Sequence, residues 1–331
     1  MAEKTNDVIG LGNTLMDFLI ELDDRQFLEF NLTKGEMHLV DERKAKEILD
    51  RMERGNFSVQ MVPGGSAANT LKGIAFLGGK VILCGKVGND KHGAAYIQEI
   101  EHHGVSARIG KHPTLATGHA IGFITPDAQR TFSVHLGAAI HFSKDEVVEE
   151  DIENSKILHL EGYQLEGPTG EAVLQAMNIA RKAGTLISID LADPGVIRRN
   201  MQLLRRVVQD YVDILFVNEE EAREFTGVIE EEAVRELGKL VSIAVVKIGK
   251  RGSWVYANGK VLKIDPYLVK AVDTTGAGDS YAAGFLYGYS QGWPLEQCGK
   301  LGSLFASKIV ETIGVRMNHL NADELKRMIK V

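Results

Sequence analysis

A glycine-rich turn near the C-terminal end of the chain has the residue types and spacing of a phosphate site. Residues 273–279 read Asp-Thr-Thr-Gly-Ala-Gly-Asp, and from Ala277 onward apolar side chains recur at helical spacing. Gly276 and Gly278 therefore lie where a loop becomes a helix, and unpaired N–H groups and the helix dipole can hold an anion there. Asp279 falls in the first helical turn, where a carboxylate can accept the proton of a nucleophile during phosphoryl transfer. The alternative is a glycine-rich turn whose aspartate only favours the helix N-terminus.

A second glycine-rich turn precedes another predicted helix. Residues 63–69 read Pro-Gly-Gly-Ser-Ala-Ala-Asn. Gly64 and Gly65 allow the backbone to approach a ligand closely, and Asn69 points back from the first helical turns toward the same place. The alternative is a structural turn followed by an asparagine that faces the helix.

A third polar stretch lies close to the N-terminus, at residues 12–17. The preceding glycines resemble a dinucleotide-binding loop, but Leu15 takes the place of its third glycine and no helix clearly follows. A dinucleotide site is therefore disfavoured. Asn13 and Asp17, two polar side chains in an otherwise apolar run, are better suited to binding sugar hydroxyl groups.

A fourth stretch follows a predicted strand directly. Asn218 and Glu221 come after the apolar residues 213–217 and would lie one turn apart on a helix. Ligands of open α/β sheets bind at the carboxyl ends of strands, so this pair could order a hydrated Mg²⁺ ion. The alternative is an asparagine N-cap followed by acidic residues of the first turn.

Composition and missing motifs exclude several functions. The formal net charge is −7, with 38 basic and 45 acidic residues, which argues against nucleic-acid and membrane-surface partners. The sequence has neither a G-x-x-x-x-G-K-[ST] loop nor a protein-kinase catalytic loop. Cys84 and Cys298 cannot form a disulfide framework, and the first residues have no long apolar stretch, so we expect a cytoplasmic location.

The elements that must position these motifs follow an α/β pattern. The apolar runs that read as strands lie at residues 7–10, 80–84, 157–160, 186–190, 214–217 and 243–247. Amphipathic stretches that read as helices include residues 43–54, 67–77, 170–183 and 200–208. This alternation predicts a doubly wound, mostly parallel sheet flanked by helices within a single domain over residues 1–331. Two strand-like segments at about residues 14–42 and 115–137, the second with a hairpin turn at 125–128, break the pattern and predict a separate small sheet over the core.

Taken together, these motifs resemble the ribokinase-like (PfkB) family of sugar and nucleoside kinases. The resemblance covers essentially the whole chain, and residues 64–69 and 273–279 match the two signature regions of the family in the expected order. Residues 10–42, 127–139 and 212–222 look most like the adenosine-kinase branch. The resemblance implies a doubly wound α/β core with a small β-sheet lid, with ATP as co-substrate and Mg²⁺ as metal.

By match to the family motifs, the resemblance also implies a role for individual residues. Asp279 would be the catalytic base, Gly276, Ala277 and Gly278 the anion hole, and Arg130 a contact to the transferred phosphate. The acceptor side would comprise Asn13, Asp17, Gly64, Gly65 and Asn69 at the ribose, and Leu15, Leu136 and Tyr163 at an adenine. The ATP side would comprise Lys247, Gly249 and Gly252, together with Asn218 and Glu221, which would hold Mg²⁺ through water, and Asp273, which would support K⁺. Lys247 departs from the pattern, because many relatives have threonine or serine there.

We therefore predict an ATP-dependent phosphotransferase that acts on the 5′-hydroxymethyl group of a ribonucleoside, with adenosine as the leading acceptor. Two alternatives stay open: a kinase of a free sugar or sugar derivative, such as ribose or fructose, and a non-catalytic nucleoside sensor. The expected partners are small molecules, and the chain would be a monomer or a homodimer.

Overall fold

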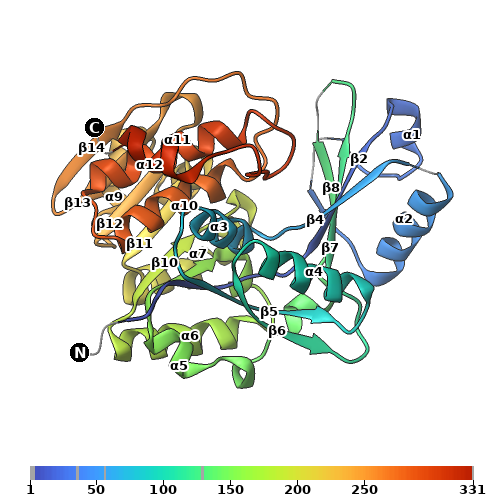
Figure 1. Cartoon of the computed structure of the whole chain (residues 1–331), viewed down its shortest axis with the longest axis horizontal. Helices are drawn as coiled ribbons and strands as arrows, with labels where there is room; N and C mark the ends of the chain where they lie inside the picture. The colour runs from blue at the N-terminus through green and yellow to red at the C-terminus, as the bar shows by residue number, and fades with distance from the viewer. Residues whose placement is uncertain (1–3, 35–36, 56, 128–129, 330–331) are drawn as a thin grey trace.

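The computed structural model describes residues 4–34, 37–55, 57–127 and 130–329, which form two β-sheets (Figure 1). The larger sheet has nine strands in the order β14-β13-β12-β11-β10-β9-β1-β5-β6. Its strands are β1 (Asn6–Leu11), β5 (Val81–Gly88), β6 (Ser106–His112), β9 (Ser155–Glu161), β10 (Leu186–Asp190), β11 (Ile214–Asn218), β12 (Ile243–Lys247), β13 (Ser253–Ala257) and β14 (Lys260–Ile264). All pairings from β6 to β12 are parallel, and β13 and β14 add an antiparallel hairpin at one edge.

Helices cover both faces of this sheet, because its central strands are apolar on both sides. Phe216 of β11 packs edge-to-face on Phe285, with ring centroids 5.4 Å apart, whereas its neighbours Leu215 and Val217 face the opposite cluster. One face carries α3 (Ser66–Phe76), α4 (Lys91–His102), α10 (Ala277–Ser290), α11 (Leu295–Ile309) and α12 (Ala322–Ile329). The other carries α5 (Glu149–Glu153), α6 (Gly170–Ala183), α7 (Pro194–Tyr211), α8 (Glu219–Thr226) and α9 (Glu230–Leu237). The predicted doubly wound α/β fold is confirmed.

The second, smaller sheet lies beside the α/β body (Figure 1). Its five strands have the order β3-β8-β7-β2-β4. They are β2 (Met16–Glu21), β3 (Met37–Leu39), β4 (Val59–Pro63), β7 (His119–Ile124) and β8 (Arg130–His135), and α1 (Asp24–Leu28) and α2 (Glu42–Arg54) accompany them. Buried side chains of α2, such as Ile48 and Met52, pack with Phe18, Ile20 and Phe123 on one face of the sheet. Strand β4 lies outside both segments that the sequence marked for this sheet, and the turn at 125–128 lies partly outside the described residues.

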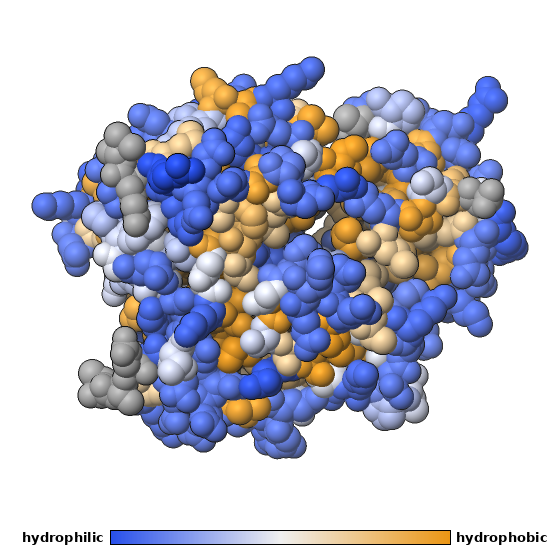
Figure 2. Space-filling model, in the orientation of Figure 1, coloured by the Kyte–Doolittle hydropathy of each residue, from blue (hydrophilic) through white to orange (hydrophobic). Residues whose placement is uncertain are grey.

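The chain passes between the two sheets at the predicted polar motifs. It leaves the large sheet at the end of β1 and enters the small sheet at Met16, and it returns from Pro63 through a Gly-Gly pair into α3. Figure 2 shows a mostly hydrophilic surface, with hydrophobic residues gathered where the small sheet meets the body. Within the described part of the chain, no helix has both the length and the apolar character to cross a membrane.

Candidate active site

The loop before α10 is shaped by glycine and by one aspartate. Gly276 caps the helix with a φ of +70°, and a Cβ there would collide with the side chain of Val315. The Asp273 carboxylate accepts hydrogen bonds from the backbone N–H groups of Thr275 (2.8 Å) and Gly314 (2.6 Å). A loop fixed in this way presents the start of α10 to a cavity of about 580 Å³. Ala277 and Gly278 line this cavity, and their role as an anion hole stays a prediction.

Asp279, in the first turn of α10, is held by the helix that follows the second glycine motif. Its Oδ1 accepts a hydrogen bond from the Ser66 hydroxyl (2.7 Å) and its Oδ2 accepts one from Asn69 Nδ2 (3.0 Å). Burial raises the pKa of Asp279 above its ordinary value, although both hydrogen bonds oppose this shift. The carboxylate lines the cavity in a fixed orientation. A half-buried carboxylate with a raised pKa is a suitable general base near neutral pH.

The second glycine motif brings the residues at 12–17 to the same place. The Asp17 carboxylate lies against Gly64 so closely that a Cβ at this glycine would collide with it. Gly65 has a φ of +96°, and a Cβ there would collide with the backbone oxygen of Asn13. The Tyr96 hydroxyl donates to the Gly64 carbonyl (2.9 Å), which fixes the turn from behind. The two glycines are therefore required by the close approach of Asp17 and Asn13, whereas the predicted approach to a ligand stays a prediction.

Glu161, which the sequence did not mark, is a buried carboxyl residue next to the helix that holds Asp279. It ends β9 with 1% of its surface exposed, and its Oε1 accepts a hydrogen bond from the N–H of Ala67 (2.5 Å) near the start of α3. Burial raises the pKa of Glu161 to about 8, although the hydrogen bond from Ala67 opposes this shift. A carboxyl residue that ends an otherwise apolar strand was the available signal.

The raised pKa of Glu161 predicts how the stability of the protein changes with pH. From the ordinary value of 4.5 up to about 8, the unfolded state loses this proton while the folded state keeps it. The stability that the protonated form contributes is therefore fully present below pH 4.5 and is lost as the pH rises to 8. Because the Glu161→Gln variant is neutral at every pH, we expect wild type to lose about 1.4 kcal/mol of unfolding free energy per pH unit relative to it. Urea unfolding of both proteins from pH 5 to pH 8 measures this difference, and a difference that does not change with pH would contradict the assignment.

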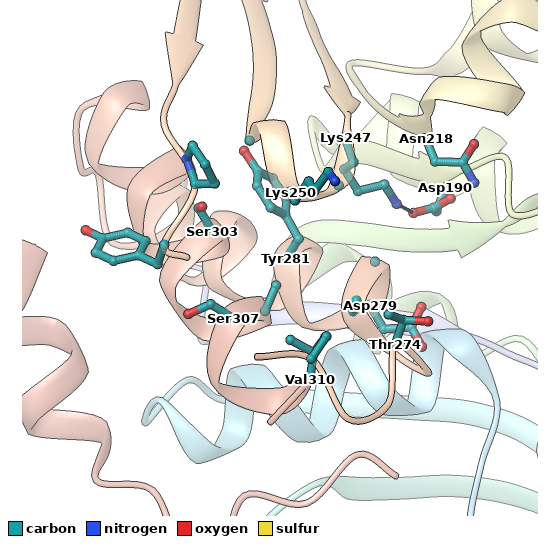
Figure 3. A pocket seen from close by; sticks show the side chains of 18 of the residues that line it. Asp190, Asn218, Lys247, Lys250, Thr274, Asp279, Tyr281, Ser303, Ser307 and Val310 are labelled. Carbon is teal, nitrogen blue, oxygen red and sulfur yellow. Dashed lines mark hydrogen bonds and ion pairs between the residues drawn. The ribbon is translucent and has the colours of Figure 1, made fainter. Parts of the chain in front are cut away.

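The cavity continues from Asp279 to the ends of β10, β11 and β12, as Figure 3 shows. Lys247 Nζ forms a buried ion pair with Asp190 Oδ2 (2.5 Å) and lies 3.0 Å from the position of a Cβ on Gly278. Burial lowers the pKa of Lys247, but Asp190 and Glu221 outweigh it and raise the pKa above its ordinary value. A charged ammonium group thus lies beside the start of α10. The sequence alone had left open which way the Lys247 side chain points.

Asn218 and Glu221 line the same cavity and also cap α8. The Asn218 side chain accepts the N–H of Glu221 (2.9 Å), and the Glu221 carboxylate accepts the N–H of Asn218 (2.8 Å). Burial, followed by the charge of Asp190, raises the pKa of Glu221 to about 7. The alternative capping role is therefore present in the structure, and it keeps both side chains at the cavity wall.

The rest of the cavity is mostly apolar. Gly249 and Gly252, with φ values of +56° and +89°, form part of its wall beside Lys250. The apolar lining comprises Pro266, Tyr267, Leu268, Val269, Ala271, Ala306 and Val310. A space of this size, apolar at one end and charged at the other, suits a nucleotide.

Three residues predicted to flank an adenine do not lie together. Leu15 and Leu136 share a small apolar cluster with Val134 and Ala139 on the small sheet. Tyr163 packs against the large sheet instead and lines the large cavity, with its hydroxyl 3.5 Å from the Ala192 carbonyl oxygen. Arg130 begins β8, but its side chain lies outside the described part of the structure.

The fold and this site define a class of protein, the small-molecule kinases with a doubly wound α/β body and a second small sheet. The chain belongs to the family described as pfkB family carbohydrate kinase, which matches residues 40–321. It is an ATP-dependent phosphotransferase, as the sequence predicted.

Similar proteins include kinases of both nucleosides and sugars. A nucleoside kinase of Methanothermobacter thermautotrophicus is 30% identical over 95% of this chain and 93% of its own length. A 5-dehydro-2-deoxygluconokinase of Clostridium perfringens is 29% identical over 84% of this chain and 86% of its own length. The crystal structure of adenosine kinase from Sinorhizobium meliloti superimposes with a TM-score of 0.89 at 30% identity, covering 98% of this chain and 99% of that one.

Proposed function

We propose that this kinase phosphorylates the 5′-hydroxymethyl group of a ribonucleoside, with adenosine as the preferred acceptor. One observation carries the choice of a nucleoside: the carboxylate suited to a ribose diol has an apolar neighbour. Asp17 is the second residue of β2, and Leu15 lies directly before the strand, two residues from Asp17; Leu15 packs with Leu136 and Val134. A free sugar has no group for such an apolar surface, whereas a nucleoside has a flat base beside its ribose.

Asp279 and the start of α10 would carry out the transfer. The acceptor diol binds Asp17, and its hydroxymethyl oxygen then lies between Asp279 and the phosphates of ATP. This oxygen forms a bond to the γ-phosphorus, the bond from that phosphorus to ADP breaks, and Asp279 takes the hydroxyl proton. The N–H groups at Gly276–Gly278 and the nearby Lys247 ammonium stabilise the charge on the moving phosphoryl group.

Residues at the cavity wall fit a magnesium ion. Glu221, Asn218 and Asp190 present oxygen atoms beside the predicted phosphate position, and Mg²⁺ prefers oxygen ligands and usually keeps several waters. We propose that Glu221 and Asn218 hold the hydrated ion, which would neutralise phosphate charge when bound. Support of K⁺ by Asp273 stays a prediction.

We further propose that the small sheet acts as a lid that excludes water from the transfer. The side chain of Arg316, on the body, donates to Gln60 of β4, and Leu19 of β2 lies next to Gly314. Arg316 and Gly314 belong to one segment, so both contacts bring the small sheet against it. The N–H group of Gly314 also donates to Asp273 in the loop before α10, which links the small sheet to that loop.

A second candidate is a sugar-derivative kinase, which the similarity to a 5-dehydro-2-deoxygluconokinase favours. An ADP-release assay with adenosine, guanosine, inosine, cytidine, ribose, fructose 6-phosphate and 5-dehydro-2-deoxygluconate separates the two. We expect the highest kcat/KM with adenosine, and a parallel preparation of the Asp279→Asn variant gives the background. Turnover of a free sugar with none for any nucleoside would refute the nucleoside assignment. Nucleoside binding without phosphoryl transfer would indicate a sensor.

A further inference from the structure

Helix α3 contains a buried lysine that the motif analysis does not explain. Lys72 is 4% exposed, and its ammonium group donates a hydrogen bond to the Pro63 carbonyl oxygen (2.7 Å). Pro63 is the residue directly before Gly64. A buried ammonium group costs free energy unless opposite charges surround it, so the position requires an explanation.

Two carboxylates of the proposed acceptor site lie near this ammonium group. Asp17 lies against Gly64, and Asp279 is held by Ser66 and Asn69, which precede Lys72 on the same helix. Burial lowers the pKa of Lys72 to about 8, although the negative charges of Asp17, Asp279 and Glu99 oppose this shift. On the α4 side, the groups that face Lys72 are Glu99, which is exposed, and His103. Asp17 also faces the Tyr96 hydroxyl from α4.

We propose that Lys72 is a positioning residue whose buried ammonium group holds the Asp17 carboxylate in its charged form, ready to accept hydrogen bonds from the hydroxyl groups of the acceptor. Burial raises the pKa of Asp17 to about 7, and Lys72 is the cation that opposes this shift. A protonated Asp17 would use one oxygen as a donor and would accept fewer acceptor hydroxyls. The inference rests on the proposed function for the identity of the acceptor.

The proposal predicts a change in pH dependence that a merely structural lysine would not cause. Without the ammonium charge, the pKa of Asp17 rises further. As the pH is lowered, Asp17 then becomes protonated, and acceptor binding weakens, already at a higher pH than in wild type. Because Ser66 and Asn69 still orient Asp279, kcat at saturating acceptor should change less than KM. The acid limb, which is the fall of kcat/KM on the acidic side of its pH profile, should therefore move to higher pH while kcat is largely retained.

Three variants separate the charge of Lys72 from its hydrogen bond to Pro63. In Lys72→Met we expect the KM for adenosine at pH 7 to rise about 10-fold and the acid limb to move up by about one pH unit or more. Lys72→Gln keeps a donor but has no charge and should give the same shift, and it also serves if the methionine variant does not fold. Lys72→Arg keeps the charge and should restore the wild-type limb. The control Glu99→Gln, which removes an exposed carboxylate near Lys72, should match wild type. An unshifted acid limb in the uncharged variants would overturn the proposal.

A measurement without substrate distinguishes this inference from the proposed function. Urea unfolding at pH 8 of Lys72→Met, Asp17→Asn and the double variant forms a double-mutant cycle. We expect the double variant to lose less stability than the sum of the two single losses, because either single change already removes the whole interaction between the two groups. Additive losses would overturn the role of Lys72. If the cycle shows coupling but wild type phosphorylates no acceptor, the proposed function fails and the Lys72–Asp17 interaction stands.

Discussion

Replacing Asp279 by asparagine is expected to lower kcat by about 10²–10⁴-fold, the usual contribution of a general base. The asparagine keeps the shape of the side chain and can still bond Ser66 or Asn69, so the fold and ligand binding should be retained. What is lost is the negative charge that accepts the proton of the attacking hydroxyl group. ADP release under saturating ATP and acceptor measures kcat, and equilibrium titration with adenosine measures binding.

A graded variant tests whether the orientation of Asp279 also matters. Ser66→Ala removes one of its two side-chain hydrogen bonds but leaves the carboxylate in place, so we expect a smaller loss in kcat of about 10-fold. Near-normal turnover of Asp279→Asn would show that the base is assigned to the wrong residue. A full loss in Ser66→Ala, equal to that of Asp279→Asn, would place the serine itself in the reaction.

The second large effect is expected at Asp17. A hydrogen bond to a charged group contributes about 1.5–3 kcal/mol, and Asp17 is proposed to accept two from the ribose diol. Asp17→Asn should therefore lower kcat/KM for adenosine by about 10²–10³-fold, mainly through KM, because the remaining amide can still accept one hydroxyl. The control Glu21→Gln, at the exposed end of the same strand, should leave kcat/KM unchanged.

A deoxynucleoside acceptor shows whether Asp17 acts through the ribose hydroxyls. In wild type, 2′-deoxyadenosine should have a lower kcat/KM than adenosine, because it lacks one hydroxyl of the diol. In Asp17→Asn, the two acceptors should differ much less, since the partner of that hydroxyl has changed. An equal discrimination in both proteins would mean that another residue binds the diol.

The larger fold was predictable because its signals are local. Buried parallel strands such as β11 and β12 are apolar throughout, and the alternation with amphipathic helices identifies a doubly wound sheet. The strands β6 and β14, which were not predicted, lie at the two edges of the sheet, where several side chains are exposed and the apolar pattern weakens. Strand β4 was missed in the small sheet for the same reason.

Within the site, the parts that depend on neighbours along the chain could be predicted from the sequence. The two glycine turns, the start of α10 and the position of Asp279 follow from turn chemistry and helical periodicity, which act over a few residues. Tertiary structure alone decided which distant side chains meet: Asp279 bonds Ser66 and Asn69, more than 200 positions earlier, and Lys247 pairs with Asp190. These contacts depend on the order of the strands in the sheet, and the apolar strands do not encode that order individually. The separation of Tyr163 from Leu15 and Leu136 has the same cause, since Tyr163 follows β9 of the large sheet, Leu15 and Leu136 flank strands of the small one, and no local pattern relates one sheet to the other.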